Sequence, residues 1–178
     1  MKIIQFLCVM AVLLAVFAGA AAAQKKAPKR PAAKKPAANK TTVQPLDIRT
    51  AREKVSIQLD NVNRFIDVLG PVAQGIETLD RSAQTNSLTK AAIDRNEANK
   101  QKVIVAIRNL RSGLSDLETH FRTKTSLQKY LSSIQGITDL ASQSEDAAIA
   151  GKFVGSKEPL RDVAQKLTDT LALIPLSR

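Results

Sequence analysis

Few side chains in this sequence belong to the types that carry out chemistry. Among the 178 residues, His120 is the only imidazole and Cys8 is the only thiol. The two methionines, Met1 and Met10, lie in the same first ten positions as Cys8. The rest of the chain therefore has no residues for a disulfide, a zinc–thiolate site, an attached c-type haem or a Cys-His catalytic pair.

The single imidazole also has the wrong neighbours for a helical metal site. Di-metal sites in helical bundles use a Glu-x-x-His spacing, whereas Glu118 precedes His120 by two positions. The sequence has no nucleophile elbow, phosphate-binding loop or dinucleotide-binding fingerprint. We therefore expect no enzyme, no cofactor and no metal site. His120 is expected to be structural or exposed near a helix end, where a cation suits the helix dipole.

The acids and the aromatic residues have structural interpretations. The acids lie largely beside bases at helical spacing, which is typical of solvated helix faces. Aromatic side chains are expected in the core or as plugs at its ends. Outside the first 45 positions they are Phe65, Phe121, Tyr130 and Phe153.

A run of cations is the pattern that most clearly suggests a binding function. Residues 24–45 contain four of the seven prolines and no acid, so we expect a disordered, partly extended tail. Its cations would attach it weakly and salt-sensitively to an anionic polymer or an anionic membrane surface. The proposed contact residues are Lys25, Lys26, Lys29, Arg30, Lys34, Lys35 and Lys40.

The same tail has a second interpretation as a solvated spacer. It contains no aromatic residue to stack on bases, so sequence-specific nucleic acid binding is not expected. Asn39-Lys40-Thr41 matches the N-glycosylation pattern, whose use depends on the source of the protein.

The first 23 residues have the pattern of a secretory signal peptide. Lys2 precedes an apolar run, and the stretch ends in Ala and Gly, so cleavage after Ala20 or after Ala23 fits the small-residue rule. The predicted organisation is a signal peptide over 1–23, the tail over 24–45 and a folded domain over 46–178. The protein would then be secreted or periplasmic.

Retention of this segment is the alternative. Residues 3–23 are about 21 in number, long enough to span a bilayer, and the cations that follow them favour the cytoplasmic side. The protein would then be anchored in the inner membrane.

The net charge of +11 is unevenly distributed. Residues 1–45 hold eight basic residues and no acid, whereas 46–178 hold the other 19 bases and all 16 acids. A basic groove across the folded domain is therefore not expected.

Apolar residues in the folded domain recur every three or four positions, which predicts amphipathic helices. No sustained period-two alternation indicates strands. Ser156 is expected to cap the last helix, with Glu158 and Pro159 in its first turn and Pro175 beyond its end. Short connections favour an all-α fold of the antiparallel up-down four-helix type. The predicted helices cover 47–84, 88–121, 125–150 and 157–174.

Gly70-Pro71 interrupts the first predicted helix, and a kink is expected there. The first two helices are longer than the last two, so residues near 71–102 should project as a two-helix hairpin. Two helices alone bury little apolar surface, so a protein partner or a second copy of the chain could pack against this hairpin. The alternative is that the chain folds back at Gly70-Pro71.

In an up-down arrangement, the start of the first helix, the 122–125 turn and the C-terminus share one end. This end is predicted to be basic, with Asp47 and Glu118 as the opposing acids. The expected cations are Arg49, Arg52, Arg122, Lys124 and Arg178.

The sequence thus predicts an exported, non-enzymatic helical bundle with a binding or structural role in the envelope or the extracellular space. One alternative is a membrane-anchored or intracellular helical adaptor that keeps its apolar N-terminus. Another is a small-ligand carrier with a pocket between its helices.

Overall fold

The structure is a computed structural model that describes residues 46–85 and 88–176. The predicted signal peptide, the retained-anchor alternative and the cationic tail lie outside these residues. The described part consists of helices and turns, without a strand. The predicted all-α class is therefore confirmed for the described residues.

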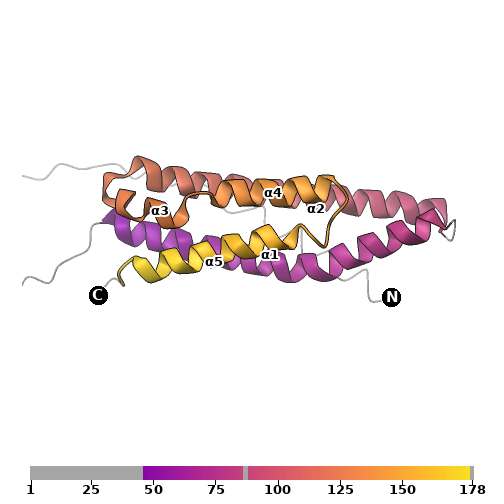
Figure 1. Ribbon diagram of the computed structural model, residues 1–178, viewed down its shortest axis with the longest axis horizontal. Helices are drawn as coiled ribbons and strands as arrows, with labels where there is room; N and C mark the ends of the chain where they lie inside the picture. Colours follow the sequence, from indigo (N-terminus) through magenta and orange to yellow (C-terminus); the bar gives the residue numbers. More distant parts are fainter. Residues whose placement is uncertain (1–45, 86–87, 177–178) are drawn as a thin grey trace, which may run out of the picture. The chain divides into compact units, whose positions relative to one another are not determined.

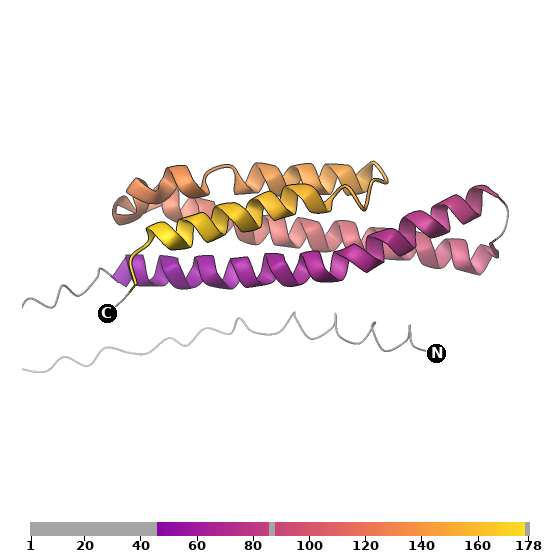
Figure 2. The same ribbon diagram turned by 60° about the horizontal axis from the view of Figure 1, so that its bottom comes forward.

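Helix α1, Leu46–Gln84, runs through Gly70 and Pro71 without a break. Figure 2 shows that it changes direction partway along, as expected for a helix that contains a proline. The helix continues because its buried stripe continues: Ala73 and Ile76 are buried beyond the proline. The single long helix is confirmed, and the alternative in which the chain folds back is wrong.

Helix α2, Lys90–Thr123, begins two residues later than predicted. The side chain of Thr89 caps it by accepting a hydrogen bond of 3.3 Å from the backbone N–H of Ala92. The helix ends at Lys124, whose backbone is extended.

The prediction of one helix over 125–150 is wrong. This segment contains a 3₁₀ helix, η3 (Thr125–Tyr130), and two α-helices, α3 (Leu131–Ile134) and α4 (Ile137–Ile149). Gly136 separates α3 from α4 with a φ of +90°, a left-handed conformation that favours glycine. The buried stripe crosses this turn, since Ile134 and Ile137 share one core cluster, so the apolar spacing alone does not reveal the break.

Helix α5, Lys157–Leu173, has Glu158 in its first turn and ends before Pro175, as predicted. Ser156 occupies the N-cap position, as predicted, but its side chain does not cap the helix. Its backbone is helical (φ −65°, ψ −13°), and its hydroxyl donates instead to the carbonyl of Phe153 at 2.7 Å. The chain already turns before Ser156, so the hydroxyl is used within that turn.

Helix α1 packs against α2 and α5, and α4 packs against the same two helices (Figure 1). The core has two clusters, one toward the start of α1 and one toward the turn between α4 and α5. Phe121 and Tyr130 belong to the first cluster, Phe153 belongs to the second, and Phe65 packs against the second. The predicted core positions of these four aromatic residues are confirmed.

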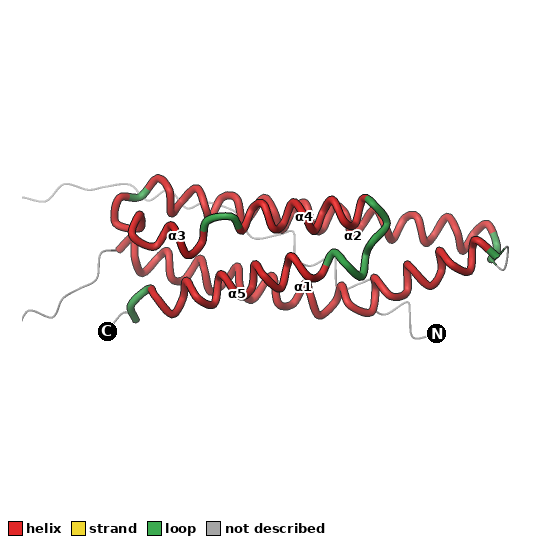
Figure 3. Tube along the Cα trace, viewed as in Figure 1, coloured by secondary structure: helices red, strands yellow, loops and turns green. Residues whose placement is uncertain are grey.

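The helices differ greatly in length. Helices α1 and α2 have 39 and 34 residues, whereas α4 and α5 have 13 and 17. At about 1.5 Å per residue, the first pair reaches about 58 and 51 Å and the second pair about 20 and 26 Å. Figure 3 shows α1 and α2 extending beyond the turn between α4 and α5.

The projecting part is shorter than predicted. Ala73, Ile76 and Val103 are buried in one cluster with Phe153, so the turn between α4 and α5 covers them. We therefore define the projecting hairpin as the described residues between Thr78 in α1 and Lys100 in α2.

Candidate functional site

The cations predicted to contact a polyanion lie outside the described residues, which begin at Leu46 in the first turn of α1. Their role therefore stays a prediction. They are Lys25, Lys26, Lys29, Arg30, Lys34, Lys35 and Lys40.

Three chain segments meet at one end of the helical unit. Lys124 Nζ, just after α2, lies 3.6 Å from Asp47 Oδ1 in the first turn of α1. Arg52 Nη1 donates to the carbonyl oxygens of Leu171 at 2.7 Å and Ile174 at 2.5 Å, at the end of α5. The predicted meeting of the first helix, the turn after the second helix and the end of the last helix is therefore confirmed.

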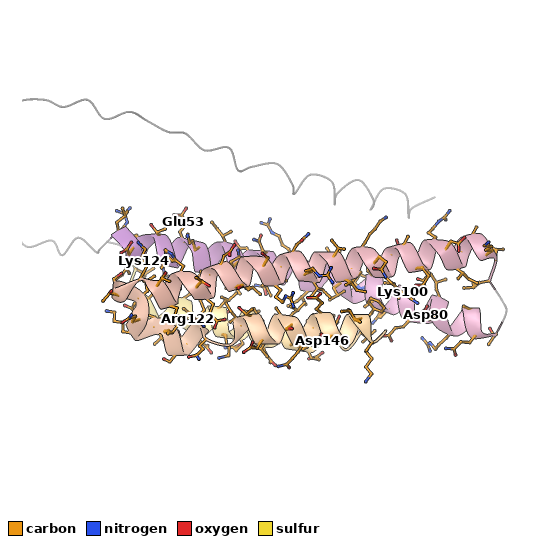
Figure 4. All side chains as sticks on the ribbon, turned by 90° about the horizontal axis from the view of Figure 1, so that it is seen from above. Glu53, Asp80, Lys100, Arg122, Lys124 and Asp146 are labelled. Atoms are coloured by element: carbon orange, nitrogen blue, oxygen red, sulfur yellow. The ribbon has the colours of Figure 1, made fainter. Side chains whose placement is uncertain are left out.

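We call this region the basic end. Two of its cations have acidic partners: Arg122 Nη2 lies 3.0 Å from Glu118 Oε1, and Lys124 faces Asp47. Arg49 is exposed, and Arg178 lies outside the described residues. Figure 4 shows Glu53, Arg122 and Lys124 together here. The residues of the basic end are six bases against four acids: Arg49, Arg52, Lys54, Arg122, Lys124 and Lys129, with Asp47, Glu53, Glu118 and Asp169.

Glu118 is more than a counterion. Its carboxylate is buried, and Oε1 accepts a hydrogen bond from the backbone N–H of Gly136 at 3.3 Å. Oε2 accepts from the backbone N–H of Thr138 at 3.3 Å and from its hydroxyl at 2.8 Å. Because Gly136 has no side chain that could cap α4, a residue of α2 supplies the acceptors that the start of α4 needs.

His120 lies in α2 near its end, but its environment disfavours the charged imidazole. Nε2 is buried and has no hydrogen-bond partner among the described residues. Burial lowers the pKa of His120, and the nearby cations Lys54 and Lys124 lower it further, against a smaller opposing effect of Asp47. The pKa of His120 is therefore lowered by burial and by nearby positive charge, although the residue lies near the end of a helix.

His120 should make the protein less stable in mild acid. Below about pH 6.5, the ordinary pKa, the unfolded chain binds the proton before the folded chain does, so the free energy of unfolding falls with falling pH. Above that pH, both states are neutral and this residue adds no pH dependence. Urea unfolding at pH 7.5 and 5.5 should show a larger drop in the parent than in His120→Gln. Equal drops would contradict this assignment.

Two half-exposed arginines of α2 form ion pairs with one buried acid of α4, which was not predicted from the sequence. Glu145 is buried, and Arg108 Nε donates to its Oε1 at 2.8 Å. Arg111 Nη1 lies 3.0 Å from Oε2, as an ion pair without hydrogen-bond alignment. The two arginines are three residues apart in the sequence, but only the packing of α4 against α2 shows that they share one acid.

Two shallow, open grooves are found on the described surface. One is lined by the first three turns of α1, and the other by polar side chains of α2 and α4 beside Arg108 and Arg111. Two buried acids lie next to residues that line the second groove. Glu118 accepts hydrogen bonds at the start of α4, and Glu145 pairs with the two arginines. These acids therefore join helices.

The projecting hairpin has a polar core. Asn96 of α2 is buried, and its Nδ2 donates to Asp80 Oδ1 of α1 at 2.8 Å. Lys100 Nζ lies 2.7 Å from Asp80 Oδ1 and 2.7 Å from Glu97 Oε1; Figure 4 shows Lys100 and Asp80 together. Partial burial acts to lower the pKa of Lys100, but the hydrogen bonds and charges of the two acids outweigh it and raise this pKa.

This polar cluster specifies how α1 and α2 align. A buried asparagine in a two-helix seam stabilises the register in which its amide finds a partner and disfavours the shifted ones. The sequence alone does not show the pairing of Asn96 with Asp80, because that pairing depends on the register of the hairpin. Polar contacts therefore fix the alignment of α1 with α2 beyond the main core.

The described residues contain no group of histidines, cysteines and acids suited to a metal ion. None of their helices is long and apolar enough to cross a membrane. No family model, no curated protein and no solved structure matches the chain.

Proposed function

We propose that this protein is an exported, non-enzymatic binding or structural protein, secreted or periplasmic. Its helical unit acts as an antiparallel up-down four-helix bundle formed by α1, α2, the segment from η3 to α4, and α5. The signal peptide over 1–23 and the disordered tail over 24–45 belong to the same proposal. The tail attaches the protein to an anionic surface, and the projecting hairpin is presented to a protein partner or a second copy.

The observation that carries this proposal is the separation of the basic end from the projecting hairpin. Leu46, where the tail joins the helical unit, lies at the basic end, and the hairpin turn lies at the far end of α1 (Figure 1). A cationic attachment site at one end therefore leaves the hairpin away from the attached surface.

The buried polar groups support a structural and binding role. Glu118 caps α4, Glu145 holds α2 to α4, and Asn96 aligns the hairpin. Each of these side chains is committed to contacts between helices, which favours a scaffold over a catalyst.

Binding to lipid vesicles of phosphatidylglycerol and phosphatidylcholine across a salt series tests the attachment. The parent should bind these vesicles, more weakly as salt rises, and should not bind vesicles of phosphatidylcholine alone. Replacing the seven tail cations by glutamine should weaken binding at least about tenfold, since each basic residue near an anionic membrane contributes about 1 kcal/mol.

A matched variant controls for net charge. It replaces seven bases of the helical unit outside the basic end by glutamine, and we expect it to bind within about threefold of the parent. Equal affinity of the parent and the tail variant would contradict the proposed attachment. The control positions are Lys90, Arg95, Lys102, Lys152, Lys157, Arg161 and Lys166.

A further inference from the structure

Three mostly exposed leucines lie at the basic end. Leu46 is 76% exposed, Leu173 is 58% exposed and Leu176 is 71% exposed. Leu46 opens α1, Leu173 closes α5, and Leu176 follows just beyond. The contact of Arg52 in α1 with the carbonyl of Ile174 holds these two helix ends together, and Figure 2 shows them side by side. The leucines therefore share one end of the helical unit.

Cations lie beside the first of these leucines, since Arg49 and Arg52 line one groove with Leu46. Single exposed apolar side chains are common on protein surfaces and need no explanation. Here, however, three of them adjoin a region with six bases against four acids, and two of those acids, Asp47 and Glu118, already face Lys124 and Arg122. The surface at this end therefore combines exposed apolar side chains with cations.

That combination matches the boundary region of an anionic bilayer. Apolar side chains lower their free energy by entering the zone between head groups and acyl chains, while lysine and arginine contact lipid phosphates. A soluble polyanion would satisfy the cations but would leave the leucines in water. Lipid is therefore the partner that accounts for both features.

We infer that the basic end itself docks end-on onto an anionic lipid bilayer. Leu46, Leu173 and Leu176 enter the head-group region, and Arg49, Lys54 and the neighbouring cations contact phosphates. This inference rests on the proposed function, because the cationic tail joins the helical unit at Leu46. It adds that the folded unit takes part in binding and that the projecting hairpin points away from the membrane.

The first test compares two triple variants of the full chain on the vesicles used above. The docking variant is Leu46→Ser, Leu173→Ser, Leu176→Ser, and we expect it to bind at least about tenfold more weakly than the parent. The control is Val68→Ser, Val105→Ser, Ile149→Ser, which changes three exposed apolar side chains elsewhere and should bind like the parent. Thermal unfolding of both variants shows whether the fold is kept.

Heparin distinguishes lipid from a soluble polyanion. The docking variant should keep the parent's affinity for heparin, because that ligand contacts only the cations. An equal loss on heparin and on vesicles would overturn the inference in favour of general damage to the cationic surface. Unchanged vesicle binding by the docking variant would also overturn it. In that case, weaker binding by the tail variant would still uphold the proposed function, whereas unchanged binding by both variants would remove both proposals.

A fluorescent probe tests the end-on orientation independently of affinity. An environment-sensitive dye is attached at Leu173→Cys or, in a second protein, at Ala91→Cys in the projecting hairpin, both in a Cys8→Ser background. Anionic vesicles should shift the emission of the dye at position 173 to shorter wavelength and leave that at position 91 unchanged. No shift at position 173, or an equal shift at both, would overturn the inference.

Discussion

Replacing Glu118 by alanine is expected to lower the free energy of unfolding by about 3 kcal/mol. The change removes a buried carboxylate that accepts hydrogen bonds from the backbone of Gly136 and Thr138. Gly136 cannot cap α4 itself, so these donors would be left without their partner at the positive end of the helix dipole. Urea unfolding at pH 7.5 measures the loss.

Three further variants identify the cause of that loss. Glu118→Gln keeps one acceptor oxygen but loses the charge, so its loss should be smaller than that of the alanine variant. Thr138→Val removes only the hydroxyl contact and should cost about 1 kcal/mol. Glu53→Ala removes an exposed acid of the basic end and should change stability by less than about 0.5 kcal/mol. If Glu118→Ala were no more destabilising than Glu53→Ala, Glu118 would not be the cap of α4.

The long helices were predictable because their apolar stripes are regular and their ends carry local signals. Thr89 caps the start of α2, and Pro175 lies just beyond the end of α5. The observed start of α2 and end of α5 lie within two residues of the predicted ones. The continuity of α1 through Pro71 was predictable for the same reason, since buried residues recur on both sides of the proline.

The turn at Gly136 was not predicted because it leaves the apolar stripe intact. Ile134 and Ile137 are three residues apart, as in a continuous helix, although a left-handed glycine lies between them. The local signal that could have found it is the glycine itself, in a stretch otherwise free of helix breakers. Ser156 does stand at the start of α5 as predicted, but its hydroxyl donates to the carbonyl of Phe153 in the preceding turn instead of capping the helix.

The residues that join the helices depend on which helices are neighbours. Glu118 lies four residues before Arg122 in the sequence, and Glu145 lies next to Asp146. Charged residues in such positions are usually exposed, yet both acids are buried against another helix. Sequence spacing shows partners three or four residues apart, whereas Thr138 is 20 residues from Glu118 and Arg108 is 37 residues from Glu145. The leucines of the basic end were missed for a related reason, because they come from opposite ends of the folded domain.

The central structural claim is that α1 continues past Pro71 and carries the hairpin beyond α4 and α5. Pulsed electron–electron spin resonance tests it with spin labels at Arg49→Cys and Gln84→Cys in a Cys8→Ser background. The two positions are 35 residues apart in one helix, so we expect a distance of about 50 Å. A control pair, Arg49→Cys with Asp67→Cys, lies before the proline and should give about 27 Å whether or not the chain folds back. A distance below about 25 Å between positions 49 and 84 would show that the chain folds back at Gly70-Pro71, and the projecting hairpin would not exist.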